Sequence, residues 1–151
     1  MSYVQSVLQP GEEIRYRAGL HWVLYIPGLL FAVAALIVLL ATRNGAYAFF
    51  WLIVEVILAL IAFYLLFNAW FERWTTEIAV TNRRVIYKTG FIRRETNEMH
   101  MDKVESVRVD QSILGRLLDY GDVTVLGTGT GFETLTRVGA PLELRNHITG
   151  V

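Results

Sequence analysis

Two long apolar runs separated by a short polar stretch dominate the hydrophobic pattern of the chain. The first run, residues 22–41, has no charged side chain, and the second, residues 46–67, has one, Glu55. The stretch between them consists of Thr42, Arg43, Asn44 and Gly45. Because an α-helix rises about 1.5 Å per residue, each run covers the roughly 30 Å of hydrocarbon in a bilayer. The pattern predicts a transmembrane helical hairpin within residues 22–71.

A cleaved signal peptide is the competing interpretation of the first apolar run. The apolar core of such a peptide is usually about 7–15 residues long. Residues 22–41 form a longer run, and a polar segment, residues 1–21, with a Pro10–Gly11 turn signal precedes it. We therefore expect a membrane span here, entered from a lead-in segment at residues 1–21.

Short runs with β-strand composition replace the long apolar runs after Phe71. Strands are expected at residues 74–80, 83–89, 92–101, 104–109, 121–126 and 132–138. Ser112 is a candidate cap for a helical turn at 112–118, and Pro141 suits the start of a short C-terminal helix at 140–148. Such a pattern is typical of a small β-barrel or sandwich with a helix over one open end.

The chain thus divides into three predicted parts, residues 1–21, 22–71 and 72–151, of which the last is a second, strand-rich domain. Residues 14–18 alternate apolar and basic side chains, which indicates a short strand or an extended lead-in. The predicted fold class is an α+β membrane protein.

The charged side chains lie mostly outside the predicted spans. The chain is 54% hydrophobic and has a formal net charge of zero, so there is no overall basic field that would attract nucleic acid. The basic residues that flank the spans on one side are Arg15, Arg17, Arg73, Arg83, Arg84 and Lys88. The connection between the spans has only Arg43. The positive-inside rule then places both termini in the cytoplasm.

Glu55 is the one acidic residue within the predicted spans. It lies about 13 Å into its helix, close to the bilayer midplane, where a carboxylate costs about 2.5 kcal/mol or more. One interpretation is a Glu that is protonated or buried at a helix interface, with hydrogen bonds across helices. The other is a proton or ion path, which would require several subunits. We expect Glu55 to lie at the interface of a homo-oligomer.

Small side chains recur at helical spacing on one face of the first span, at Gly28, Ala32 and Ala35. Such residues let helices approach closely in a membrane. The partner on this predicted intramembrane interface is either the second span, through Ala59 and Ala62, or another chain.

Several sequence segments resemble the bacterial pleckstrin-homology (PH) domain family, in its YdbS-like group of small membrane proteins. The matching segments are residues 8–13 (LQPGEE), 21–22 (HW), 80–86 (VTNRRVI), 103–107 (KVESV), 110–118 (DQSILGRLL) and 120–125 (YGDVTV), together with Gly90. The resemblance implies a bacterial inner-membrane protein with two transmembrane helices, a cytoplasmic PH-like barrel and a short C-terminal helix. It implies no catalytic residues.

The clearest candidate binding group is a set of cations without an intervening acid: Arg83, Arg84, Lys88, Arg93 and Arg94. If residues 83–89 and 92–101 pair through a turn at Gly90, these side chains flank one hairpin near the membrane. Each cation near an anionic leaflet contributes about 1 kcal/mol of binding. The alternatives are an ordinary solvated strand face and a dipolar protein-binding surface, since acids follow at Asp102, Glu105, Asp110, Asp119 and Asp122.

No residue set in the sequence indicates an enzyme or a cofactor site. The chain has no cysteine, and His21, His100 and His147 are too far apart to suggest a metal site. Residues 127–131 (GTGTG) lack the lysine and helix of a phosphate loop. We predict a membrane-anchored binding or scaffold module that acts through self-assembly, a cytoplasmic protein partner or anionic lipid headgroups. The alternative is a subunit of an oligomeric transport or ion-conducting assembly that uses Glu55.

Overall fold

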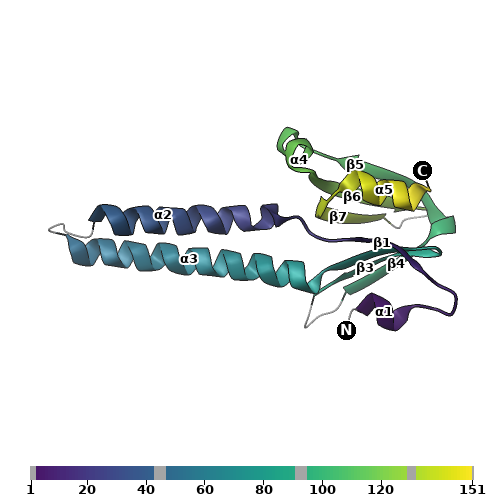
Figure 1. The fold of residues 1–151 in the computed structure, drawn as a ribbon, viewed down its shortest axis with the longest axis horizontal. Helices are drawn as coiled ribbons and strands as arrows, with labels where there is room; N and C mark the ends of the chain where they lie inside the picture. The colour runs from purple at the N-terminus through teal and green to yellow at the C-terminus, as the bar shows by residue number, and fades with distance from the viewer. Residues whose placement is uncertain (1–2, 43–46, 91–94, 129–131, 151) are drawn as a thin grey trace. The chain divides into compact units, whose positions relative to one another are not determined.

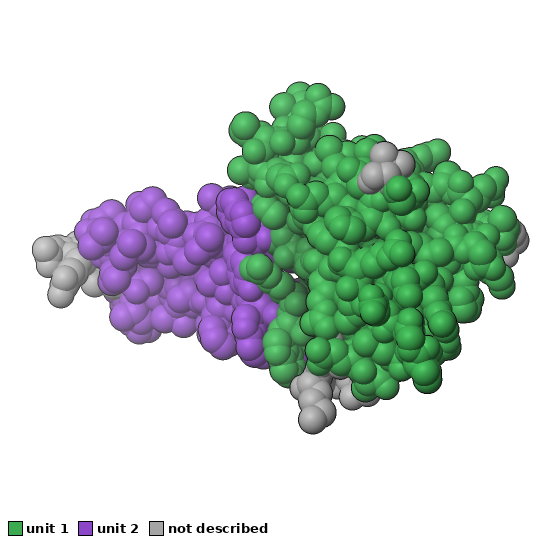
Figure 2. Space-filling view, turned by 45° about the vertical axis from the view of Figure 1, so that its right-hand side comes forward, with its two compact units in different colours: residues 1–21, 72–151 green, residues 22–71 purple. Residues whose placement is uncertain are grey.

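The structure, a computed structural model, describes residues 3–42, 47–90, 95–128 and 132–150. The chain forms two compact units, which Figure 2 shows in different colours. Unit 1 combines Met1–His21 with Glu72–Val151, and unit 2 is Trp22–Phe71. The segment before the apolar hairpin therefore belongs to the same compact unit as the strands after it.

Unit 2 is a pair of antiparallel apolar helices (Figure 1). It contains η1 (Trp22–Tyr25), α2 (Ile26–Thr42) and most of α3 (Ala48–Thr75). At Gly28 the helices are so close that a Cβ atom would lie 2.7 Å from the Leu66 side chain. Most larger apolar side chains point outward, and Leu40 and Phe49 are 69% and 79% exposed. By length and composition, both helices could cross a membrane.

The second helix is longer than the sequence pattern indicates. The sequence pattern predicts a span that ends at Phe67 and a strand that begins at Trp74, but α3 continues to Thr75. No glycine or proline interrupts this segment, and its aromatic rings meet at helical spacing, with 5.8 Å between the ring centroids of Phe67 and Trp70. Helix continuation therefore overrides the β preference of Trp74 and Thr75.

Unit 1 contains two antiparallel sheets. The first has the order β1-β2-β3-β4 and contains β1 (Ile14–Ala18), β2 (Glu77–Thr81), β3 (Arg84–Thr89) and β4 (Glu95–His100). The second has the order β5-β6-β7 and contains β5 (Val104–Asp110), β6 (Tyr120–Gly127) and β7 (Phe132–Gly139). The predicted strands after the hairpin are confirmed, with shifts of a few residues at their ends.

The apolar hairpin is an insertion between two neighbouring strands. β1 precedes the hairpin, β2 follows it, and the two pair antiparallel with Arg17 opposite Ala79 and Ala18 opposite Ile78. Of the two interpretations of residues 14–18, the structure supports the strand. Since adjacent strands lie about 4.8 Å apart, both ends of the hairpin connect to the same end of one sheet.

Short helices complete unit 1. They are α1 (Tyr3–Val7), η2 (Met101–Lys103), α4 (Ile113–Leu118) and α5 (Pro141–Thr149). The predicted cap of α4 is confirmed, because the Ser112 hydroxyl accepts a hydrogen bond of 3.0 Å from the Gly115 amide. The predicted C-terminal helix is also confirmed, with Pro141 in its first turn.

One core joins both sheets to the C-terminal helix. Its fully buried side chains include Ile78 of β2, Val125 of β6, Leu135 of β7 and Leu144 of α5. Burial of one such side chain stabilises a fold by about 1.5–3 kcal/mol. α5 contacts β1 and β5 and so covers one side of the space between the sheets (Figure 1).

The predicted β-barrel is not closed in the part of the chain that the structure describes. A single bridge, Leu20 to Val138, connects the chain after β1 with β7. η2 joins β4 to β5 without pairing them, and β4 and β7 are edge strands of different sheets. The two sheets are therefore held together by their shared core rather than by a continuous hydrogen-bonded ring.

We predict that Gly121→Ala destabilises unit 1 by about 1–3 kcal/mol, the usual cost of overpacking. A Cβ atom at this position in β6 would lie 2.6 Å from the backbone oxygen of Asp110 in β5, and backbone cannot yield locally. Thermal unfolding of the full-length protein in detergent should show a midpoint lower by about 4 °C or more.

The matched control for this prediction is Gly19→Ala. No atom lies within 4 Å of the Cβ that this substitution adds, and Gly19 has no strained φ angle. An equal effect of both substitutions on the unfolding midpoint would show that the close approach of β5 and β6 at Gly121 does not constrain the fold.

Candidate functional site

The five predicted cations do not form one exposed surface among the described residues. Arg83 is exposed, whereas Arg84 is buried and Lys88 keeps only 14% of its side chain exposed. The Lys88 amine lies 3.8 Å from a Glu77 carboxylate oxygen and over the Tyr3 ring. Arg93 and Arg94 lie outside the described residues. Two of the three described cations are thus partnered within unit 1.

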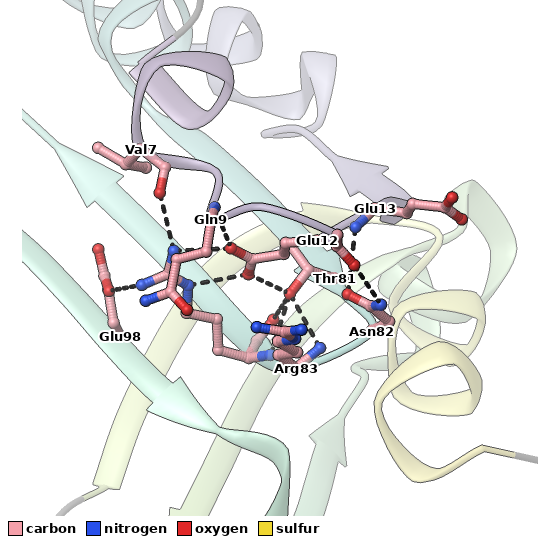
Figure 3. A network of polar contacts seen from close by, with 10 residues as sticks. Val7, Gln9, Glu12, Glu13, Thr81, Asn82, Arg83 and Glu98 are labelled. Carbon is pink, nitrogen blue, oxygen red and sulfur yellow. Dashed lines mark hydrogen bonds and ion pairs between the residues drawn. The ribbon is translucent and has the colours of Figure 1, made fainter.

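Arg84 is the centre of a polar network at the start of β3. Figure 3 shows this network, with Val7, Glu12 and Glu98 among its labelled members. Its guanidinium donates two hydrogen bonds, of 2.9 and 2.8 Å, to the two carboxylate oxygens of Glu12. It donates a third, of 2.6 Å, to Glu98 of β4 and a fourth, of 2.8 Å, to the backbone oxygen of Val7. A guanidinium so occupied does not present its charge to solvent, which argues against Arg84 as a headgroup ligand.

Glu12 is as deeply buried as its partner. In addition to the bonds from Arg84, its carboxylate accepts hydrogen bonds from the Thr81 hydroxyl at 2.7 Å and from the backbone N–H of Gln9 at 2.9 Å. The hydrogen bond from Arg84 is the main cause that lowers the pKa of Glu12 from 4.5 to about 2, against the opposing effect of burial. The same bond raises the pKa of Arg84 above its usual value. Both groups therefore remain charged over the whole physiological pH range.

This network attaches the N-terminal segment to the first sheet. The predicted Pro10–Gly11 turn places Glu12 opposite the β2–β3 turn, and Gly11 adopts a φ of 76° that favours glycine. Asn82 of that turn accepts a hydrogen bond from the Glu13 amide and donates one to the Gly11 oxygen. Glu12 and Glu98 are not predictable as partners of Arg84, because no local sequence pattern distinguishes them from other acids.

The predicted intramembrane residues lie on the facing sides of the two helices. Gly28 and Ala35 of α2 are buried, and Ala32 is half-buried. Glu55 lies seven residues before Ala62 and fourteen before Ala69, both of which are buried, so Glu55 shares the inner face of α3. Glu55 is half-buried, and none of the hydrogen bonds between described side chains includes it. This placement indicates that the Glu55 carboxyl group lies at the interface between the two helices of the hairpin.

A cavity of about 290 Å³ lies between the two sheets, on the side where β4 and β7 are not paired. Its lining combines apolar side chains with acids and an amide, and consists of Val85, Tyr87, Asn97, Glu98, Met99, Val125, Glu133 and Leu135. The volume is close to the lower limit of small ligand pockets. Met99 is a flexible side chain that adapts to irregular partners.

The lining of this cavity is acidic. The pKa of Tyr87 is raised, first by burial and then by the negative charges of Glu133, Glu72 and Glu95. The Asn97 amide donates a hydrogen bond of 2.8 Å to Glu133 and so connects β4 with β7 across the cavity. The cavity therefore favours neutral or cationic groups and disfavours anions.

The described residues contain no group of three or more acidic or histidine side chains that could hold a metal ion. Two histidines stack on tyrosine rings, His147 on Tyr16 at 4.4 Å and His21 on Tyr120 at 5.2 Å between ring centroids. His21 and His147 therefore act as packing residues in unit 1.

Two antiparallel sheets of four and three strands, with a C-terminal helix over one side, define a PH-like fold. The family model of the bacterial PH domain matches residues 18–150, and the chain belongs to this family. No curated protein and no solved structure matches the chain. PH domains are generally binding modules without catalytic activity, so the fold indicates a binding or scaffold module.

We predict that Glu12→Gln lowers the stability of unit 1 by about 3 kcal/mol at neutral pH, since it leaves a buried guanidinium short of one charge partner. Because the folded-state pKa of Glu12, about 2, lies below the usual 4.5, its contribution is complete above pH 4.5 and is lost as pH falls towards 2. Thermal unfolding of the full-length protein between neutral and acid pH measures both effects.

The control is Glu13→Gln, which removes the adjacent, exposed carboxylate without touching Arg84. The wild type and Glu13→Gln should lose stability in parallel below pH 4.5, whereas the curve of Glu12→Gln should be flatter. Parallel curves for all three proteins would contradict the assignment.

Proposed function

We propose that this chain is a membrane-anchored binding module in which residues 22–71 are the anchor and unit 1 recognises a protein partner. The two apolar helices support the anchor, because most of their large side chains point outward. β1 before the hairpin pairs with β2 after it, so a spanning hairpin must leave and re-enter on one side of the membrane. This requirement agrees with an even number of spans.

The flanking cations support a bacterial cytoplasmic location for that side. Arg15 and Arg17 precede the hairpin and Arg73 follows it, whereas its connection has only Arg43. The proposal therefore includes a multi-pass location in the cytoplasmic membrane, with both termini and unit 1 inside.

The observation that favours a protein partner is the cavity beside the edge strand β4. Most residues of this strand, Glu95–His100, are exposed, and no strand among the described residues pairs with its outer edge. An extended peptide can add to such an edge through backbone hydrogen bonds and place alternate side chains in adjacent pockets. The cavity would accept an apolar side chain between β4 and β7.

The charge of the cavity suggests which peptide would bind. Glu95 and Glu133 lie on β4 and β7, whereas Glu98 is paired with Arg84, and Lys88 is paired with Glu77. Acidic side chains around an apolar cavity complement a peptide that alternates basic and apolar residues. An anionic lipid headgroup fits this site less well.

We predict that the full-length protein in zwitterionic nanodiscs binds a labelled decapeptide of alternating lysine and valine more tightly than its glutamate–valine counterpart. Fluorescence anisotropy measures both affinities, with empty nanodiscs as the blank. Glu133→Lys should weaken binding of the lysine–valine peptide roughly three- to tenfold, since it reverses one charge at the partly exposed rim.

Glu105→Lys is the matched control, because it makes the same charge change on β5, where Glu105 is exposed and does not line the cavity. A lysine–serine peptide tests the apolar contribution and should bind more weakly than the lysine–valine peptide. Equal affinity for the basic and acidic peptides, or an equal loss in both variants, would refute the proposed site.

A further inference from the structure

The short helix α4 exposes a continuous apolar face. Ile113, Leu114 and Leu117 are 91%, 62% and 79% exposed, and their spacing places them on one side of the helix. The other large aliphatic side chains of unit 1 lie mostly in its core. α4 projects beyond the adjacent ends of β5 and β6 (Figure 1). An apolar group presented in this way indicates an interaction surface.

Neighbouring residues fix the conformation of α4. Ser112 caps its first turn, and Asp119 ends it in a left-handed conformation. Gly115 is packed so closely that a Cβ atom would lie 2.6 Å from the Tyr120 oxygen, and the Gln111 amide donates a hydrogen bond of 3.1 Å to that same oxygen. The apolar side chains are therefore held outward by the backbone of α4 and the strand that follows it.

α4 lies at the point where the chain leaves unit 1 for the apolar hairpin. The ring of Tyr120, two residues after α4, stacks on the ring of His21, and His21 also hydrogen-bonds the backbone of Leu118. The next residue, Trp22, begins the first apolar helix segment. Within unit 1, α4 therefore lies near His21, the last residue of unit 1 before the chain enters the predicted span.

Trp74 marks the same end of unit 1. It lies in the last turn of α3 and is 60% exposed. Four residues later, Ile78 pairs with Ala18, which lies three residues before His21, so Trp74 and His21 are at the same end of the first sheet. Tryptophan side chains prefer the interfacial layer of a bilayer, where an apolar ring and a polar N–H are both accommodated. The end of unit 1 that carries α4 therefore also carries a residue suited to the membrane surface.

We infer that the apolar face of α4 inserts into the cytoplasmic interfacial layer of the bilayer, as a third point of attachment beside the two ends of the hairpin. This inference rests on the proposed membrane anchor. A helix of six residues is too short to span, but three aliphatic side chains beside the charged Arg116 suit shallow insertion with the charge kept at headgroup level. The occupant of this surface is lipid hydrocarbon just below the headgroups.

Depth-dependent fluorescence quenching tests this inference on the full-length protein in phosphatidylcholine liposomes. The chain has no cysteine, so a single introduced cysteine takes an environment-sensitive nitrobenzoxadiazole label at one site. Leu117→Cys and Ile113→Cys probe α4. Lipids that carry a nitroxide near the headgroup should quench both labels at least about twofold, as expected for an interfacial side chain.

Two further labels separate this inference from the anchor proposal. Glu13→Cys lies just before β1, whereas His21 lies after the other end of this strand, roughly 25 Å away along an extended chain, and the Glu13→Cys label should stay unquenched. Leu30→Cys is an outward position in α2, 65% exposed, and nitroxides deep in the acyl chains should quench its label. Quenching at Leu30 without quenching at either α4 label overturns the inference alone.

The remaining outcomes also decide the question. Absence of quenching at Leu30 overturns the anchor and the inference with it. Protection of the α4 labels from aqueous iodide without quenching by lipid nitroxides would show that protein covers α4, and this too overturns the inference.

Discussion

The pairing of β1 with β2 is the constraint on which the rest of this structure depends. The two strands are neighbours in one sheet, yet the whole apolar hairpin lies between them in sequence. Their pairing makes the N-terminal segment part of the PH-like unit and brings both ends of the hairpin to one end of a sheet. For any membrane in which the hairpin is embedded, residues on both sides of it then face the same compartment. The loop closed by this pairing is long, but the entropy of loop closure grows only slowly with length, and a hairpin that folds by itself shortens the effective loop.

Two buried features hold this long-range arrangement in place. The first is the bidentate pairing of Arg84 with Glu12, which connects the N-terminal turn to the start of β3. A buried ion pair adds little net stability relative to an apolar pair, but it penalises any arrangement in which one partner is absent. The second is the apolar core of both sheets and α5. The core packs the sheets face to face without closing a barrel, and this leaves the cavity beside β4 and β7. The same geometry that avoids closure thus supplies the candidate binding site.

Local features of the chain were predictable, and long-range ones were not. The apolar helices, the Ser112 cap, the Pro10–Gly11 turn and most strands follow from hydrophobic periodicity and from residues with defined backbone preferences. Arg84 illustrates the limit, because it stands among cations in the sequence, whereas its partner Glu12 is 72 positions away. The extension of α3 past Phe67 was missed because Trp74 and Thr75 favour strands locally. The cavity could not be predicted, since its lining comes from four strands of two sheets whose relative packing has no local signature.

The central claim is that a strand before the apolar hairpin completes the sheet after it. Hydrogen–deuterium exchange of the full-length protein in nanodiscs tests this claim through the amides of residues 14–18 and 77–81. If β1 and β2 form one ladder, both segments exchange slowly, and Glu12→Gln accelerates both together. Full exchange of residues 14–18 at the earliest time point, while residues 77–81 remain protected, would contradict the account.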